Sequence, residues 1–293
     1  MPYDSFKPHE PSERSTLKQV RGKPFSIGSG FDALSFTHPM YAGAMDPLIM
    51  VDHFTMTAPT FGPHAHAGLS AVSILFEDSE GVFNNKDSLG NDIDLQPGDL
   101  YWLKAGRGAV HDEKPRTGAR THALQVFVNL PARMKYDAPD SLHVKASEMP
   151  VLVGEGYSAR LVLGESNGTK GTKSPALPMT ILDVKLEEGA SFAHQVLAGQ
   201  SAWVLAVDGA FGVRNGDAAA SLKPGVSVSI RAQGQAHDLI ISGNTKAQFV
   251  ILQAEPLREP FVQRGPFAMA TEAEVDAMFA AHAAGELGSI DEF

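Results

Sequence analysis

Short apolar runs separated by turn residues make up most of this 293-residue chain. Six such runs are 71–76, 121–129, 180–186, 202–207, 226–230 and 248–253. The segments between them are rich in Gly, Pro, Asn and Asp, as at 87–91, 97–99, 154–156, 215–217 and 224–225. Runs of this length suit strands, and the residues between them accept the backbone angles of tight turns. The pattern predicts an all-β fold of the sandwich or jelly-roll type.

One helix is predicted near the C-terminus. Thr271 and Glu274 form a capping box, because each side chain can satisfy a backbone N–H of the first helical turn. The apolar stripe that follows at helical spacing consists of Val275, Met278 and Phe279. We expect this stripe to pack against the β structure, and a glycine at 285 or 288 to end the helix.

A faint internal repeat predicts two copies of one β unit. Two Pro-Gly turns, at 97–98 and 224–225, each precede a histidine by 12 or 13 residues, and another histidine lies 43 to 45 residues upstream of that one. The four histidines are His66, His111, His194 and His237. Regular spacing of this kind is typical of duplicated units. The polar stretch 131–150 is the expected junction, which gives a first domain at 1–140 and a second at 141–293 that includes the helix.

Charge and cysteine content exclude several classes of function. The chain carries 24 Lys and Arg residues against 34 Asp and Glu, a net charge of −10, and it has no Lys/Arg-rich run. Direct nucleic-acid binding is therefore disfavoured. Because there is no cysteine, any metal must be held by nitrogen and oxygen ligands.

The N-terminal segment and the hydropathy pattern bear on location. Residues 1–24 lack the basic stretch and apolar core of a secretion signal. Nowhere do about 18 apolar residues run together, as a membrane-spanning helix requires. We therefore expect a soluble cytoplasmic protein that does not associate with membranes.

Two residue pairs carry the candidate chemistry. In an extended strand, side chains at i and i+2 point the same way, so the His-x-His pair at 64–66 presents both imidazoles on one face. The His-x-Glu pair at 111–113 repeats this arrangement. If both strands belong to one barrel, three nitrogens and one oxygen can converge on a metal ion, with Ala65 and Asp112 facing away. The predicted metal ligands are His64, His66, His111 and Glu113.

Each pair also has an ordinary explanation. A His-x-His pair is often a surface strand with two titratable side chains, and a His-x-Glu pair is a weaker signal still. Even together, at the edges of apolar strand patterns, the two pairs leave a metal site and a pair of surface strands both open.

Longer motifs resemble those of the pirin family of two-barrel (bicupin) proteins. They are His64-Ala65-His66-Ala67-Gly68, Lys86-Asp87-Ser88-Leu89-Gly90-Asn91, Gln96-Pro97-Gly98-Asp99, Ala105-Gly106-Arg107-Gly108-Ala109-Val110-His111-Asp112-Glu113, Gln125-Val126-Phe127-Val128-Asn129-Leu130-Pro131, Leu257-Arg258-Glu259-Pro260 and Gln263-Arg264-Gly265-Pro266-Phe267. The resemblance covers nearly the whole chain. It implies two cupin (jelly-roll) β-barrels in tandem with a short C-terminal helix. It also implies one iron ion in the N-terminal barrel, held by His64, His66, His111 and Glu113.

Around the first pair the chain departs from the family. The family usually reads His-Pro-His-Arg-Gly-Phe-Glu-Thr, whereas this chain has Ala67 in place of Arg and Ser70 in place of Glu. Residues around the ligands orient them and tune the metal. Strand alternation would set Ser70, Val72 and Ile74 on the ligand face, a drier and less charged wall than the family has. Substrate choice is therefore expected to differ.

The second barrel is expected to be metal-free. His194 and His237 are each followed two residues later by an apolar side chain, Val196 and Leu239, so neither completes a ligand pair. His122 matches a family position, and we expect it to pack or to form hydrogen bonds.

Four protein ligands on a metal that accepts six leave two positions for a substrate or dioxygen. Fe(II) suits this chemistry best, although Cu(II) would bind more tightly and other divalent ions are compatible. The resemblance implies an iron-dependent dioxygenase of the quercetin 2,3-dioxygenase type. A flavonol or similar aromatic substrate would chelate the metal, and Glu113 would be the catalytic general base that takes its hydroxyl proton.

Two other classes of function stay open. Some pirins act as redox-sensitive regulators that bind a protein partner, and an acidic chain without a basic patch could influence transcription or a metabolic enzyme only through such a partner. Alternatively, the metal only braces the barrel, in which case chelation lowers the melting temperature and no reaction is lost. A monomer is the default expectation.

Overall fold

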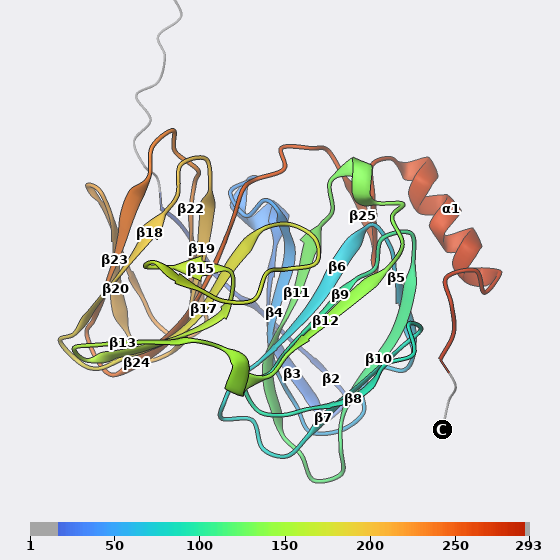
Figure 1. The fold of residues 1–293 in the computed structure, drawn as a ribbon, viewed down its shortest axis with the longest axis horizontal. Helices are drawn as coiled ribbons and strands as arrows, with labels where there is room; N and C mark the ends of the chain where they lie inside the picture. Colours follow the sequence, from blue (N-terminus) through green and yellow to red (C-terminus); the bar gives the residue numbers. More distant parts are fainter. Residues whose placement is uncertain (1–16, 291–293) are drawn as a thin grey trace, which may run out of the picture.

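The computed structural model describes residues 17–290, which form two β-barrels side by side (Figure 1). The first barrel consists of a seven-stranded sheet and a four-stranded sheet. In spatial order, the large sheet contains β12 (Asp140–Val144), β9 (Leu100–Lys104), β6 (Leu69–Leu75), β11 (Thr121–Asn129), β4 (Leu48–Met56), β3 (Phe31–Thr37) and β2 (Lys23–Ile27). The small sheet contains β5 (His64–His66), β10 (Ala109–Pro115), β7 (Phe83–Asp87) and β8 (Asp92–Leu95).

The second barrel repeats this plan and confirms the predicted duplication. Its large sheet contains β1 (Lys18–Arg21), β22 (Val226–Ile230), β19 (Ser201–Asp208), β24 (Ala247–Ala254), β17 (Met179–Leu186), β14 (Tyr157–Leu163) and β13 (Val151–Gly154). Its small sheet contains β18 (Ser191–Val196), β23 (His237–Gly243), β20 (Phe211–Asn215) and β21 (Ala218–Leu222). His194 on β18 and His237 on β23 therefore occupy the strands that correspond to those of His66 and His111.

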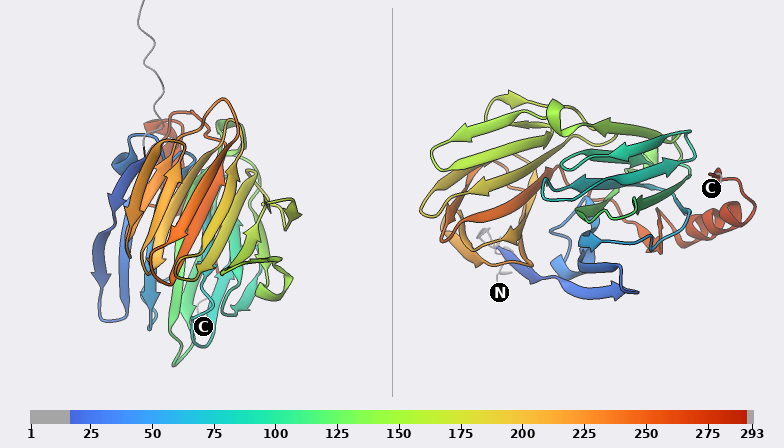
Figure 2. Two further views of the ribbon diagram at one scale, coloured as in Figure 1. Left: turned by 90° about the vertical axis from the view of Figure 1, so that its left-hand side faces the viewer. Right: turned by 90° about the horizontal axis from the view of Figure 1, so that it is seen from below.

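The two barrels exchange their edge strands. β12 precedes the second barrel in sequence, yet it pairs with β9 of the first. β1 precedes the first barrel, yet it pairs with β22 of the second, and Figure 2 shows the blue N-terminal strands beside the orange strands of that barrel. The predicted division between residues 140 and 141 therefore falls inside β12, a strand of the first barrel.

The two large sheets pack against each other and bury the main core of the protein. Phe36 of the first barrel meets Trp203 of the second edge to face, with ring centroids 5.3 Å apart. Because a large sheet is covered by the other barrel on one face and by its own barrel on the other, its central strands are buried on both faces. Every residue of β6 is buried, which is why these strands read as continuous apolar runs. All six predicted runs coincide with strands.

The helix and a hairpin cover the outside of the first barrel. α1 (Glu272–Ala283) begins at Thr271, whose hydroxyl accepts a hydrogen bond from the Glu274 backbone N–H, so the predicted capping box is confirmed. Val275 and Met278 are buried as expected, whereas Phe279 is exposed. The helix packs over a cluster that contains Ala65, Ala67, Val110, Phe267, Met269, Val275, Met278 and Leu287.

The remaining elements are short. They are the β25 (Val262–Arg264) and β26 (Phe267–Met269) hairpin, the β15 (Glu165–Ser166) and β16 (Thr169–Lys170) hairpin, and the 3₁₀ turns at His38–Tyr41, Ala132–Met134 and Ala146–Glu148. Within residues 17–290, none of the helices has the length and apolar character that crossing a membrane requires. Residues 1–16, which belong to the segment considered for a secretion signal, lie outside the described residues.

Candidate metal centre

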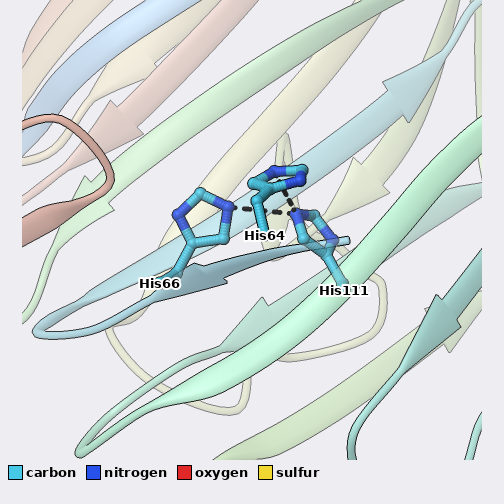
Figure 3. Close-up of side chains that lie close together, drawn as sticks. All are labelled: His64, His66 and His111. Atoms are coloured by element: carbon cyan, nitrogen blue, oxygen red, sulfur yellow. Dashed lines mark hydrogen bonds between the residues drawn. The ribbon is translucent and has the colours of Figure 1, made fainter. Parts of the chain in front are cut away.

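Two strands of the small sheet bring three histidines together. β5 carries His64 and His66, and β10 carries His111, which lies directly opposite His64 in the antiparallel pair. Opposite residues of paired strands share a face. Nε2 of His111 lies 3.0 Å from Nε2 of His66 and 3.1 Å from Nε2 of His64. Figure 3 shows the three rings directed at one another from the two strands.

Backbone carbonyls orient two of these rings. Nδ1 of His64 lies 2.9 Å from the carbonyl oxygen of Gly62. Nδ1 of His66 lies 3.3 Å from the carbonyl oxygen of Pro266, in the turn between β25 and β26. Because a carbonyl oxygen only accepts, each Nδ1 donates its proton there and each Nε2 presents a lone pair to its neighbours. The C-terminal hairpin thus helps to hold a site whose side chains come from the first barrel.

Burial keeps all three imidazoles neutral. Desolvation, reinforced by the His64 ring, lowers the pKa of His66 to about 3. Burial also lowers the pKa of His64. Burial together with the other two rings holds the pKa of His111 well below its ordinary value. Neutral imidazole is the form that binds a metal ion.

The geometry of the three nitrogens fits a transition-metal ion. The ligand atoms lie within 4.8 Å of one another, and residues 17–290 contain no other group of three or more His, Asp or Glu side chains with such geometry. Two nitrogens that are each about 2.1 Å from one ion, at right angles to each other, are about 3.0 Å apart. The Nε2 lone pairs of His64 and His66 point into the space between the three rings and would attract a cation there. The cluster is therefore a candidate metal site with three histidine ligands.

Glu113 lies beside the three histidines and not among them. Its Oε2 is 3.9 Å from Nδ1 of His111, the ring nitrogen that is not directed at the other histidines. Its Oε1 accepts a hydrogen bond of 2.5 Å from the Ser73 hydroxyl. Burial raises the pKa of Glu113 to about 7. The Ser73 hydrogen bond lowers this pKa, and the nearby Asp112 carboxylate raises it by a smaller amount. Its role as the fourth ligand stays a prediction.

The wall opposite the ligands differs from the one that strand alternation predicted. Val72 and Ile74 lie in the core between the barrels, and it is Ser73 that faces Glu113. The prediction was wrong because it continued the alternation of β5 into β6. The chain bends at Gly68, where φ is +71°, and passes from the small sheet to the large one.

The two positions that depart from the family also lie away from the ligands. Ala67 is buried in the cluster beneath α1. Ser70 is fully buried and shares the parity of Val72 on β6, so it faces the inter-barrel side. Neither residue lines the cavity at the histidines. Ala65, as expected, also faces the helix side.

A cavity of about 320 Å³ reaches the three histidines. Its apolar lining consists of Phe25, Phe31, Met50, Phe54, Met56, Phe61, Phe83, Phe127 and Pro266. Beside the four predicted ligands, its polar lining residues are Asp52 and Gln125. Asp52 belongs to none of the sequence motifs, and Gln125 belongs to a family motif that indicated no site role, because both residues lie on strands far from the two ligand pairs. Six phenylalanine rings make the space suited to a flat aromatic ligand.

Three histidines outside the cluster, His53, His122 and His194, form local hydrogen bonds. In the second barrel, Nδ1 of His194 lies 3.0 Å from the Ser166 hydroxyl, and its Nε2 lies 2.6 Å from Oε1 of Gln253. In the first barrel, Nε2 of His122 lies 2.7 Å from Nε2 of His53, and its Nδ1 lies 2.7 Å from Asp78. The predicted hydrogen-bonding role of His122 is confirmed.

Two tandem jelly-roll barrels, with a three-histidine cluster inside the first, define a bicupin protein with a candidate metal centre. Comparison with known families agrees: the pirin family model matches residues 10–128, and the model of the pirin C-terminal cupin domain matches residues 181–288. The chain belongs to the pirin family. It is 33% identical to pirin of Mus musculus over 232 residues, which cover 79% of each chain.

Solved structures agree with this assignment. A quercetin 2,3-dioxygenase from Acinetobacter baumannii is 25% identical, with a TM-score of 0.82 over 94% of this chain and 98% of that one. The bacterial pirin YhhW from Escherichia coli, solved in complex with nickel(II), is 15% identical, with a TM-score of 0.64 over 82% of this chain and 100% of that one. At that identity, the second likeness shows the shared fold alone.

Proposed function

We propose that this protein binds one divalent transition metal, Fe(II) in its active form, and oxygenates a chelating aromatic substrate of the flavonol type. The ligands are His64, His66 and His111, with Glu113 as the fourth. One observation carries the proposal: three neutral imidazoles direct their Nε2 atoms at one another in a cavity with phenylalanine walls. The likeness to a quercetin 2,3-dioxygenase, at 25% identity over nearly the whole chain, supports the choice of reaction.

The cavity would bind and orient the substrate. Its volume of about 320 Å³ lies at the lower end of the range for small-molecule sites, which is roughly 300–1,000 Å³. Phe127 lies edge to face on His66, with centroids 5.0 Å apart, so an aromatic wall stands directly beside the ligands. Such walls favour a flat ring system and exclude water from it. When bound, the metal would activate the chelated substrate toward dioxygen.

Glu113 would take the proton of the substrate hydroxyl. A general base works best when its pKa lies near the working pH, and burial raises the pKa of Glu113 to about 7. Ser73 holds Oε1, so Oε2 remains for the substrate or the metal. A carboxylate that is a metal ligand can act as a base only when its bond to the metal is loose, and this anchoring by Ser73 favours such an arrangement.

Oxygen uptake by the Fe(II)-loaded protein with quercetin tests the proposal. We expect uptake that requires both metal and substrate and that His111→Ala abolishes. His237→Ala, the corresponding position in the second barrel, is the matched control and should leave uptake unchanged. Absence of uptake, or equal uptake by His111→Ala, would refute the catalytic role. Stoichiometric metal binding without uptake would favour the alternative of a regulator that binds a protein partner.

A further inference from the structure

A row of polar side chains crosses the large sheet beneath the cavity. Ser35 on β3 lies opposite Asp52 on β4, Asp52 lies opposite Gln125 on β11, and Gln125 lies opposite Ser73 on β6. Directly opposite residues share a face, and this face is the cavity side, because Asp52 and Gln125 both line the cavity. The row begins at Ser73, the hydrogen-bond partner of Glu113. Two strand spacings, about 10 Å, separate Ser73 from Asp52.

Asp52 lies in an apolar part of this cavity. Its neighbours on the same face of β4 are Met50 and Phe54, which also line the cavity. The Oδ1 atom of Asp52 is buried and has no hydrogen-bond partner among the described residues. Burial raises the pKa of this carboxyl to about 6, although the Ser35 hydroxyl lowers it. At pH 7 and above the side chain is therefore mainly a carboxylate with one acceptor atom unused.

Ser35 contacts this carboxylate, but no cation within residues 17–290 balances its charge. None of the ion pairs of the described residues includes Asp52. Its neighbour Gln125 is engaged with Ser73, whose hydroxyl lies 2.9 Å from the Gln125 side-chain oxygen. An unpaired buried acceptor destabilises a fold, so a donor that enters the cavity would relieve this cost. The proposed metal chemistry, at the other end of the row, does not use Asp52.

We propose that Asp52 determines substrate specificity, with its side-chain carboxylate accepting a hydrogen bond from a hydroxyl or N–H group at the substrate end remote from the metal. This inference rests on the proposed function and narrows its substrate class. The substrate is a flat aromatic molecule with a chelating pair at one end and a hydrogen-bond donor at the other. A substrate with a carboxylate at that end is rejected, because like charges repel in a site of low polarity.

Binding of three flavonols under argon tests this role without turnover. The ligands are 3-hydroxyflavone, which has the chelating pair alone, and its derivatives with one added hydroxyl at ring position 7 or 4′. Dissociation constants are measured by calorimetry on the metal-loaded protein. We expect one derivative to bind wild type about ten- to hundredfold more tightly than 3-hydroxyflavone, which is the effect of a hydrogen bond to a charged acceptor.

Three variants assign the preference to Asp52. Asp52→Leu should reduce the preference for the hydroxylated flavonol to within twofold. Asp52→Asn keeps an acceptor oxygen and should keep part of the preference. Met50→Leu changes the neighbouring side chain on the same face without changing polarity, and it should keep the full preference.

The possible outcomes separate this inference from the proposed function. Equal binding of all three flavonols by wild type, or a preference that survives Asp52→Leu, overturns the role of Asp52 while metal-dependent flavonol binding stands. Failure of every flavonol to bind the metal-loaded wild type overturns both. The melting temperature of both Asp52 variants should equal or exceed that of wild type, because they remove a buried charge that no cation of the described residues balances. A lower melting temperature in both would instead assign Asp52 a structural role and overturn the inference.

Discussion

The Ser73 hydroxyl donates a hydrogen bond of 2.5 Å to Oε1 of Glu113 across the interior of the first barrel. Ser73 lies on β6 of the large sheet and Glu113 on β10 of the small one, so the bond joins the two walls of the barrel. A hydrogen bond of this kind favours the charged carboxylate, the form that can bind a metal. It also fixes one carboxylate oxygen beside the three histidines.

Replacing Ser73 by Ala should therefore weaken metal binding. Loss of a residue that orients a ligand typically lowers metal affinity about 10- to 100-fold, and we expect a decrease in this range. Competition with a chromophoric chelator measures the affinity directly. Ser70→Ala is the matched control, because Ser70 is a buried serine of the same strand that does not line the cavity. Equal affinities in wild type and Ser73→Ala would contradict Glu113 as a ligand that Ser73 holds in place.

Metal removal should lower the melting temperature. A ligand that binds only the folded state at 100 times its dissociation constant stabilises that state by about 2.7 kcal/mol. In a chain of this size such a gain raises the melting temperature by roughly 4–5 °C. His111→Ala removes the central nitrogen of the cluster and should abolish the increase, whereas His237→Ala in the second barrel should retain it. The experiment is a thermal melt with added Fe(II), under argon, against a melt with chelator.

The candidate ligands could be read from the sequence because each pair lies within one strand. Alternation over three residues is enough to place His64 and His66 on one face, and the structure keeps both on the cavity side. The prediction failed as soon as it crossed Gly68. A positive φ at that residue and a change of sheet reset the alternation, and Ser73 rather than Val72 came to face the site.

The pairing of strands that are distant in sequence was the second feature that could not be predicted. Asp52 and Gln125 line the cavity only because β4 and β11 are paired in one register, and no local pattern in either strand indicates that pairing. The exchange of β1 and β12 between barrels is of the same kind. The duplication predicted the number of barrels, but an edge position can be filled by any strand of suitable length that lies nearby. The assignment of a single strand to one barrel therefore could not follow from the repeat.

The buried ion pair between Arg160 and Asp183 should matter more to stability than an exposed one nearby. The Arg160 guanidinium lies 2.9 Å from Asp183 and also donates to the carbonyl oxygens of Gly98 and Leu75 in the first barrel. Arg160→Met leaves a buried carboxylate unpaired, which costs about 3–5 kcal/mol. Lys185→Met, the control, breaks an exposed pair of 2.6 Å with Glu77 and should cost less than about 1 kcal/mol. Urea unfolding gives both values, and similar values would refute the distinction.

The cost of the buried Asp52 carboxylate should appear as a dependence of stability on pH. The carboxyl pKa is about 6 in the folded protein against an ordinary value of 3.8. Between these two values the unfolded chain has lost the proton and the folded chain still holds it, so raising the pH through this window lowers the free energy of unfolding. The total loss above pH 6 is about 3 kcal/mol. Asp52→Asn cannot titrate, so its stability relative to wild type should increase from pH 4 to pH 7 and then level off. Urea unfolding at several pH values measures the difference, in which the titration of all other groups, including Glu113, cancels to first order. If the free energies of unfolding of Asp52→Asn and wild type differ by the same amount at every pH in this range, the Asp52 carboxylate is already stabilised by a partner in the folded protein.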